Sequence, residues 1–392
     1  MSAGVRHAYV YGLAEAYFVE EAIGITVILQ AVSLSILLIP VVYWFLMSLR
    51  TEINGHNVSK IKSPSVTILL PMRNEEKNVI RKLKSVILEI VEIENANLLV
   101  IDSGSTDNTA DIASGFLSDE FEQESRWEVV SWPEPGKSRA INRAVAKIES
   151  EIIVMTDADA YVSPGWLEII TQRLSEKEIG VVSGLEDENF SENDRFNSYY
   201  RKKSNWLRIK ESEFGSTPVL EGSIIAWDTG KIGKIQIDEG VNADDAQIGM
   251  ISIRKGFRSI IDRRVSFHDF EMKKRGFGES VRRSQGLSIV LLKNADLAFF
   301  PKGRGSRLPI INAISLYVVF PWASLIFSIN SIFAFYNAPE ISLNWPFFSI
   351  LSIIAVATIP SGRVLLTGVI ISLISHFQAI FGKRYNVWNP IR

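Results

Sequence analysis

The residues whose types and spacing are best suited to chemistry are Asp157 and Asp159, which follow an apolar run at 152–155. That run predicts a buried strand, and alternate side chains of an extended segment point the same way. The two carboxylates can therefore face one point, where two like charges require a cation. Oxygen ligands at a strand tip suit Mg²⁺ or Mn²⁺ shared with nucleotide phosphates. A D-x-D pair alone also occurs in solvated acidic turns, so its neighbours decide its meaning.

The elements that must position these carboxylates alternate between strand and helix. A further helix is expected at 163–176, opened by Ser163 as N-cap and Pro164 at the first helical position. Such alternation predicts an α/β fold with a parallel sheet, whose ligands lie at the carboxyl ends of the strands. Asp102 and the Asp157/Asp159 pair fall at such ends, which predicts one shared site. The expected strands are 66–70, 98–101, 128–130 and 152–156, and the expected helices between them are 76–91 and 136–148.

Two further groups offer side chains for a nucleotide. After the first strand, the guanidinium of Arg73 can donate hydrogen bonds to a phosphate or a ribose, and the carboxylate of Glu75 can accept one from a hydroxyl. The segment Pro135-Gly136-Lys137-Ser138-Arg139 resembles a phosphate loop but lacks the spacing of a P-loop NTPase, which is excluded on that ground. Lys137 and Arg139 remain candidates for diphosphate contacts.

Both ends of the chain are apolar enough for membrane helices. The uncharged run 22–49 exceeds the roughly 20 residues that a bilayer requires, and 309–336 is a second such run. The segment 345–381 is too long for one crossing and contains Pro360, so we expect one or two further helices there. The bases after the first run place the central part in the cytoplasm and the protein in the cell membrane as a multi-pass protein.

The remaining boundaries follow from these assignments. Residues 1–21 are expected outside the cytoplasm, 50–64 form a polar linker, 65–270 form the catalytic domain, and 271–308 are amphipathic and suited to the membrane interface. A net charge of −2 gives no indication of nucleic-acid binding. The absence of cysteine excludes disulfides, thiolate zinc sites and a catalytic thiol.

Four motifs together resemble one enzyme family. P-x-R-N-E at 71–75, D-S-G-S-x-D at 102–107, G-K-x-x-A-I-N at 136–142 and T-D-A-D-A at 156–160 are similar, in order and spacing, to the family 2 inverting glycosyltransferases. The branch that fits best is membrane-bound and resembles cellulose and hyaluronan synthases and their bacterial and archaeal relatives. The resemblance implies a GT-A fold, which is a Rossmann-like α/β catalytic domain for nucleotide-diphospho-sugars, joined here to α-helical transmembrane segments.

The resemblance also implies roles for individual residues. A divalent cation, Mn²⁺ or Mg²⁺, would bind Asp157 and Asp159, with His268 as a candidate third ligand. The segment 242–245 resembles the T-E-D motif, so Asp245 would be the general base, with Asp244 beside it. Arg282 and Arg283 would close on the diphosphate. The nucleotide-binding residues would be Pro71, Arg73, Asn74, Glu75, Asp102, Ser105, Lys137, Arg139 and Asp157, and the acceptor-binding residues would be Glu221, Gly222, Ser223 and Trp227.

The expected activity is transfer of a sugar from a UDP- or GDP-linked donor to a hydroxyl of a lipid-linked or glycan acceptor. Three alternatives remain open: a polyprenyl- or dolichyl-phosphate sugar synthase, a processive polysaccharide synthase, and a membrane scaffold that binds nucleotide-sugar without turnover. The Q-x-x-R-W motif of the synthases is absent, which disfavours a processive polysaccharide synthase. Expected partners are membrane lipids, the nucleotide-sugar and the acceptor.

Overall fold

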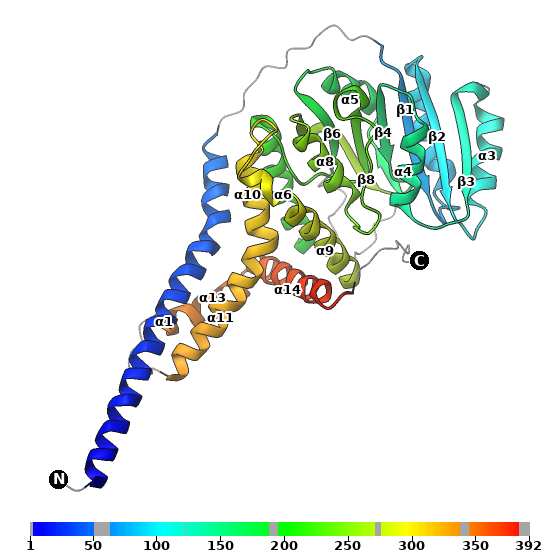
Figure 1. The fold of residues 1–392 in the computed structure, drawn as a ribbon. Coiled ribbons are helices and arrows are strands. Elements are labelled where there is room, and N and C mark those ends of the chain that lie inside the picture. The colour runs from blue at the N-terminus through cyan, green and yellow to red at the C-terminus, as the bar shows by residue number, and fades with distance from the viewer. Residues whose placement is uncertain are drawn as a thin grey trace.

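The computed structural model describes residues 3–50, 63–121, 123–187, 195–270, 276–337 and 345–383. An α/β domain with a single eight-stranded sheet lies at one end, and long helices extend from it (Figure 1). The strands are β1 (Val66–Met72), β2 (Ala96–Ser103), β3 (Trp127–Trp132), β4 (Ile152–Thr156), β5 (Ala160–Val162), β6 (Ile179–Glu186), β7 (Ile224–Asp228) and β8 (Arg258–Asp269).

The strand order is β3-β2-β1-β4-β7-β6-β8-β5. The first four strands are parallel, as the alternation of strands and helices predicted, whereas β7 runs antiparallel to both β4 and β6. The sheet is therefore mixed, and this arrangement is the GT-A fold. Its parallel half brings the carboxyl ends of β1, β2 and β4 to one edge.

Helices cover both faces of the sheet. Because strand side chains alternate, Ile68 and Leu70 of β1 enter one core under α2, α3 and α5, while Leu69 enters a second core under α4 and α8. The catalytic-domain helices are α2 (Val79–Glu92), α3 (Thr109–Glu120), α4 (Lys137–Lys147), α5 (Trp166–Leu174), α6 (Arg195–Phe214), α7 (Thr229–Ile232), α8 (Asp244–Arg254) and α9 (Phe277–Lys293), with short 3₁₀ turns at Glu124–Arg126 and Ala295–Ala298.

Helix α5 corrects one expectation. It begins after Gly165 rather than at Ser163, because the carboxylate of Glu89 in α2 accepts from the backbone N–H groups of Gly165 (2.7 Å) and Leu167 (3.1 Å). Ser163 instead extends the sheet edge, and its N–H donates to the carbonyl of Ser266. A side chain distant in sequence thus caps the helix and fixes where it starts.

The segments expected to be membrane helices are helical. Helix α1 (Ala3–Ser48) is continuous through the boundary expected at residue 21, and at 46 residues it is about 69 Å long. Within the described ranges, three helices are long and apolar enough to cross a bilayer, at Gly24–Ser48, Arg307–Tyr336 and Pro360–Ile380. Most of the expected linker, at 51–62, lies outside the described residues.

The second of these helices contains an irregular turn, and the last apolar segment is broken. Helix α10 (Arg307–Ile314) passes through a π-helical turn at Ser315–Val319 into α11 (Phe320–Asn337). The 345–381 segment divides at Pro360 into α13 (Trp345–Thr358) and α14 (Pro360–Ile380), because proline cannot continue the hydrogen-bond pattern of a preceding helix. Figure 1 shows α14 lying across the direction of α1 and α11, beside α9 of the catalytic domain.

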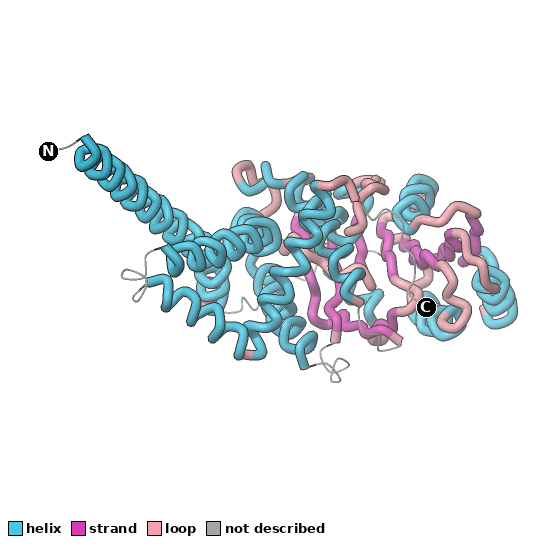
Figure 2. The backbone as a smooth tube through the Cα atoms, turned by 90° about the horizontal axis from the view of Figure 1, so that it is seen from below, coloured by secondary structure: helices cyan, strands magenta, loops and turns pink. Residues whose placement is uncertain are grey.

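Polar contacts join the long helices to one another and to the domain. Between α1 and α11, the amide of Asn330 donates to the carbonyl of Thr26 at 2.7 Å. Tyr43 of α1 donates to Glu211 of α6 at 3.0 Å. Seen from below, these helices gather at one end of the molecule (Figure 2). Hydrogen bonds between apolar helices fix their register, because an unpaired polar group there would be costly.

Helix α9 joins the catalytic domain to the apolar helices. A third core beneath it contains residues of α8, α9 and α10. On its other side, Ser284 bonds Ser375 of α14 at 3.1 Å, and Ser288 bonds His376 at 3.0 Å. Gly286 faces the chain segment before α8, where an added Cβ would lie 2.1 Å from the carbonyl oxygen of Asn242. Only glycine allows this approach without movement of the backbone.

Gly286→Ala should therefore destabilise the protein. Forcing a methyl group against backbone costs about 1–3 kcal/mol, which exceeds the gain in helix propensity of up to about 1 kcal/mol. We expect a lower midpoint of thermal unfolding in detergent. Gly278→Ala is the matched control in the same helix, since nothing lies within 4 Å of its added Cβ. Equal midpoints for the two variants would contradict the proposed close contact.

Candidate active site

The carboxyl end of β4 is the centre of the candidate site. Asp157 follows β4, and its N–H donates to the carbonyl of Ser223 just before β7 (3.1 Å). Lys137, the first residue of α4, places its Nζ 2.7 Å from Asp157 Oδ1 and 3.0 Å from Asp244 Oδ2. Asp244 is in turn the first residue of α8. Three elements distant in sequence thus meet at one lysine.

The charges in this cluster shift one another's pKa values. Burial raises the pKa of Asp157; Lys137 opposes this effect and the neighbouring Asp159 adds to it. For Asp244 the balance is reversed: burial acts to raise its pKa, but the charge of Lys137 holds it below the usual value. Burial acts to lower the pKa of Lys137, yet the two carboxylates raise it overall. Lys137 is therefore a fixed positive charge at neutral pH.

Asp245 differs from its neighbours because no lysine pairs with it in the described contacts. Burial, reinforced by the charge of Asp244, raises its pKa to about 6. Its Oδ2 lies 3.6 Å from the point that a Cβ on Gly222 would occupy, so its carboxylate faces the 221–223 segment. A carboxylate that titrates near neutrality beside an open backbone segment is suited to accept a proton from a substrate hydroxyl.

Basic side chains of α9 face the same carboxylates. The charge of Arg283 acts to lower the pKa values of both Asp244 and Asp245. Burial lowers the pKa of Arg282, and Asp244 is among the charges that oppose this effect. Arg283 also pairs with Glu279 one turn earlier (3.5 Å). The tail predicted to close on a diphosphate therefore lies beside Asp244 and Asp245.

The loops predicted to hold the nucleoside are bonded to each other. Asn74, at a positive φ of 56°, donates through its N–H to Ser105 Oγ (2.9 Å), and its Oδ1 accepts from Thr106 N–H (2.8 Å). Ser105 also donates to Asp102, which is buried. The N–H of Glu75 donates to Thr109 (2.9 Å). These bonds make one surface of the ends of β1 and β2; nucleotide contacts by Pro71, Arg73, Asn74, Glu75, Asp102 and Ser105 remain predictions.

Other predicted residues have different surroundings. Arg139 pairs with Glu239 (3.1 Å) in the segment before α8, and Glu221 pairs with Arg208 of α6. Trp227 is fully buried in the core beneath α8, and the acceptor contact expected for it stays a prediction. Position next to a motif did not reveal which face of β7 carries the tryptophan. No sequence motif pointed to Glu239 or Arg208.

His268 lies in a separate, open pocket of about 450 Å³. It pairs in register with Tyr161 of β5, and their rings lie 5.0 Å apart. Arg81 and Lys84 of α2 also line this pocket, so its character is basic. Its expected role as a third metal ligand stays a prediction.

The residues present fit a divalent cation shared with a ligand. In the described ranges, no three carboxylate or imidazole side chains gather to hold a metal by themselves. Asp159 is close enough to Asp157 for its charge to raise the pKa of Asp157, and both side chains are only partly buried. Mg²⁺ and Mn²⁺ commonly use one or two protein carboxylates and take further ligands from substrate phosphates. Asp157 and Asp159 would therefore hold the cation together with a diphosphate.

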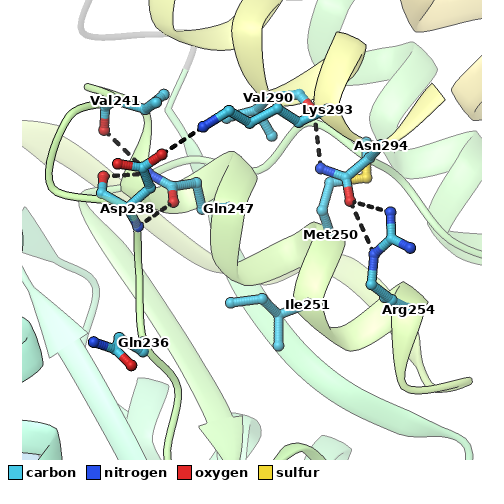
Figure 3. Close-up of a pocket in the computed structure, with 10 residues that line it drawn as sticks. All are labelled: Gln236, Asp238, Val241, Gln247, Met250, Ile251, Arg254, Val290, Lys293 and Asn294. Carbon is cyan, nitrogen blue, oxygen red and sulfur yellow. Dashed lines mark hydrogen bonds and ion pairs between the residues drawn. The ribbon is translucent and has the colours of Figure 1, made fainter.

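Figure 3 shows a second pocket, of about 180 Å³, between α8, α9 and the segment before α8. Lys293 crosses it to pair with Asp238 at 2.5 Å, and Asn294 accepts from Arg254 at 2.9 Å. None of the predicted site residues lines it. These contacts tie α9 to the chain that leads into Asp244, so the pocket is part of the support behind the candidate site.

Removal of Lys137 should destabilise the fold. Lys137→Met leaves Asp157 and Asp244 without their counter-charge, and breaking a pair of this kind costs about 3 kcal/mol. We expect a clear drop in the midpoint of thermal unfolding without added metal. Arg143→Met is the control from the same helix, because Arg143 pairs with Glu134 at the exposed surface. A variant as stable as the wild type would show that Lys137 does not balance the carboxylates.

Comparisons with known proteins bear on the domain and its fold. Residues 67–231 match the family described as Glycosyl transferase family 2. Glycosyltransferase GlyG of Streptococcus pneumoniae is 26% identical over 123 residues, which span 31% of this chain and 39% of GlyG. Protein RfbJ of Shigella flexneri is 23% identical over 129 residues, which span 33% of this chain and 91% of RfbJ.

A solved structure is similar over most of the chain. The mannosyltransferase PcManGT of Pyrobaculum calidifontis, in complex with GDP-Man and Mn²⁺, superposes with a TM-score of 0.73 at 21% identity. The similarity covers 91% of this chain and 99% of PcManGT, and it shows a shared fold. Together with the motifs and the sheet, these matches show that the chain carries a glycosyltransferase family 2 domain with the GT-A fold.

Proposed function

We propose that this protein is a membrane-bound inverting glycosyltransferase that moves a sugar from a nucleotide-diphosphate sugar to a hydroxyl of a lipid-linked or glycan acceptor. The observation that carries the proposal is the position of Asp245. Its carboxylate has a pKa of about 6, faces the 221–223 segment, and lies next to the Lys137–Asp157–Asp244 cluster. A proton acceptor thus lies directly beside a place suited to a diphosphate.

The donor side contains the groups that a departing diphosphate requires. Lys137 supplies a fixed positive charge, and Arg282 and Arg283 approach from α9. A bound Mn²⁺ or Mg²⁺ would supply Lewis-acid stabilisation of the leaving diphosphate. PcManGT, which shares the fold, holds GDP-Man and Mn²⁺, so GDP-linked donors are the first to test and UDP-linked donors the second.

In the proposed reaction, the acceptor hydroxyl gives its proton to Asp245. The hydroxyl oxygen forms a bond to the anomeric carbon as the bond from that carbon to the diphosphate oxygen breaks. The electrons of that bond leave with the diphosphate, whose charge Lys137 and the α9 arginines stabilise. Attack from the side opposite the leaving group inverts the anomeric configuration.

The base also bears on the class of acceptor. A polyprenyl phosphate arrives ionised and needs no proton acceptor, whereas a hydroxyl does. Asp245, poised to titrate just below neutrality, therefore favours a hydroxyl over the phosphate acceptor of polyprenyl-phosphate sugar synthases. The apolar helices support a lipid-linked acceptor, because they would hold the site at a membrane surface. By the distribution of basic residues, that surface is the cytoplasmic one.

The donor and acceptor can be identified directly. Detergent-purified full chain is incubated with Mn²⁺, a panel of GDP- and UDP-sugars, and either a hydroxyl-bearing glycolipid extract or polyprenyl phosphate. We expect labelled glycolipid from one donor, and loss of turnover with chelator that Mn²⁺ restores. Labelled polyprenyl phosphate alone would favour the synthase alternative. Binding of nucleotide-sugar with neither transfer nor hydrolysis would favour the scaffold.

Asp245→Asn tests the base. We expect kcat/KM for the hydroxyl acceptor to fall by at least about 100-fold, since general-base catalysis contributes about 10²–10⁴. In the wild type, kcat/KM should fall as pH decreases through about 6, because protonated Asp245 cannot accept the proton. Asp228→Asn is the control, because Asp228 caps the short helix α7 and asparagine also caps helices. Transfer by Asp245→Asn at the wild-type rate would exclude Asp245 as the base.

A further inference from the structure

A buried lysine lies directly behind the D-x-D turn. Lys82 of α2 is 1% exposed, and its Nζ donates to Thr156 Oγ1 and to the carbonyl of Ala160, both at 2.7 Å. These two acceptors are the residues on either side of Asp157-Ala158-Asp159. One ammonium group is therefore hydrogen-bonded to both ends of the turn that carries the two carboxylates.

Packing alone does not explain a lysine at this position. The residues nearest to it on the buried face of α2, Val79, Leu83 and Val86, are apolar and belong to the main core, and the other buried charge of the helix, Glu89, caps α5. Burial lowers the pKa of Lys82 to about 7, although the charges of Asp157 and Asp159 oppose the shift. A buried ammonium group is costly unless it is hydrogen-bonded and paired with opposite charge. The compensation here comes from the D-x-D turn.

The same turn is held from two other directions. On the side of β7, Thr156 Oγ1 donates to the carbonyl of Ser223 at 2.9 Å. On the side of β8, the N–H of Phe270 donates to the carbonyl of Asp159 at 2.8 Å. Lys82 adds the restraint from the helical layer beneath the sheet. The turn is thus fixed by main-chain and side-chain bonds from three elements.

We propose that Lys82 is a positioning residue that holds the Thr156–Ala160 turn in the geometry in which Asp157 and Asp159 take a divalent cation together with a nucleoside diphosphate. The inference rests on the proposed function, which places the cation at these carboxylates. Lys82 touches neither donor nor acceptor in this scheme. It acts through the backbone of the turn, as partners behind metal ligands do in other sites.

The charge of Lys82 and its two hydrogen bonds have opposite effects on the affinity of the carboxylates for the cation, which makes the proposal testable. A positive charge behind the carboxylates repels a divalent cation, so removal of charge alone would tighten binding. Loss of the two hydrogen bonds frees the turn and would weaken binding. The sign of the change in metal affinity therefore separates positioning from simple electrostatics, and a purely structural role predicts no change in the folded protein.

The experiment measures the Kd of Mn²⁺ in the presence of GDP, with UDP as a second probe, by electron paramagnetic resonance on the detergent-purified full chain. For Lys82→Met, which keeps an unbranched side chain one atom shorter but removes the charge and both bonds, we expect Mn²⁺ to bind about 10- to 100-fold more weakly, the range for partners behind metal ligands.

Lys231→Met is the matched control. Lys231 is another lysine that bonds backbone carbonyls, those of Leu174, Glu176 (2.9 Å) and Ile179 (2.8 Å), and burial lowers its pKa as well. Its loss should lower thermal stability and leave the Kd of Mn²⁺ unchanged. If Lys82→Met does not fold, Thr156→Val removes one of the two acceptors and should weaken Mn²⁺ binding in the same direction.

An unchanged or tighter Kd in the folded Lys82 or Thr156 variant would overturn the proposal, as would an equal loss of affinity in Lys231→Met. A wild type that binds no Mn²⁺ with either nucleotide would instead overturn the metal site of the proposed function. The two failures are therefore distinguishable in one titration series.

Discussion

The candidate site depends on the convergence of carboxylates that repel one another. Asp157 and Asp244 share Lys137. Burial and the repulsion of Asp244 raise the pKa of Asp245, and the N–H of Ala246 and the charges of Arg283 and Lys137 oppose them without cancelling them. Because Lys137 pairs with Asp244 and not with Asp245, the pKa values of the two neighbouring carboxylates differ. Asp244 stays ionised as part of a fixed ion pair, whereas Asp245 titrates at about pH 6 and can exchange a proton near neutrality. Environments that push neighbouring pKa values apart are typical of acid–base assignments in enzymes.

The two halves of the site are supported in different ways. Asp102 and Asp157 reach the edge on parallel strands of the sheet, where register fixes them. Asp244 and Asp245 begin a helix that follows an irregular segment, so they depend on α9, which touches that segment through Gly286 and Lys293. Because the opposite face of α9 bonds α14, the base-bearing half rests on the apolar helices. Movement of those helices would therefore displace Asp244 and Asp245, on the acceptor side, more directly than Asp102 and Asp157, on the donor side.

Sequence reasoning predicted the parts of this structure that depend on local pattern. The strand at 152–156 and the helix expected at 136–148, observed as Lys137–Lys147, follow from the local pattern of apolar residues. It failed where a distant side chain decides the outcome: Glu89 of α2 sets the start of α5. Lys82 carried one overlooked signal, a lone lysine on the apolar phase of an amphipathic helix.

Lys82 and helix α9 each hold one half of the candidate site in place. A turn that bears two carboxylates for a cation must not relax when the cation leaves, and Lys82, Ser223 and Phe270 bond it without using the side chain of either Asp157 or Asp159. The base, in contrast, must meet acceptors that arrive from outside the domain. Under the proposed function, a rigid donor half bonded within the sheet and an acceptor half bonded to apolar helices suit an enzyme whose donor is soluble and whose acceptor is carried by the membrane.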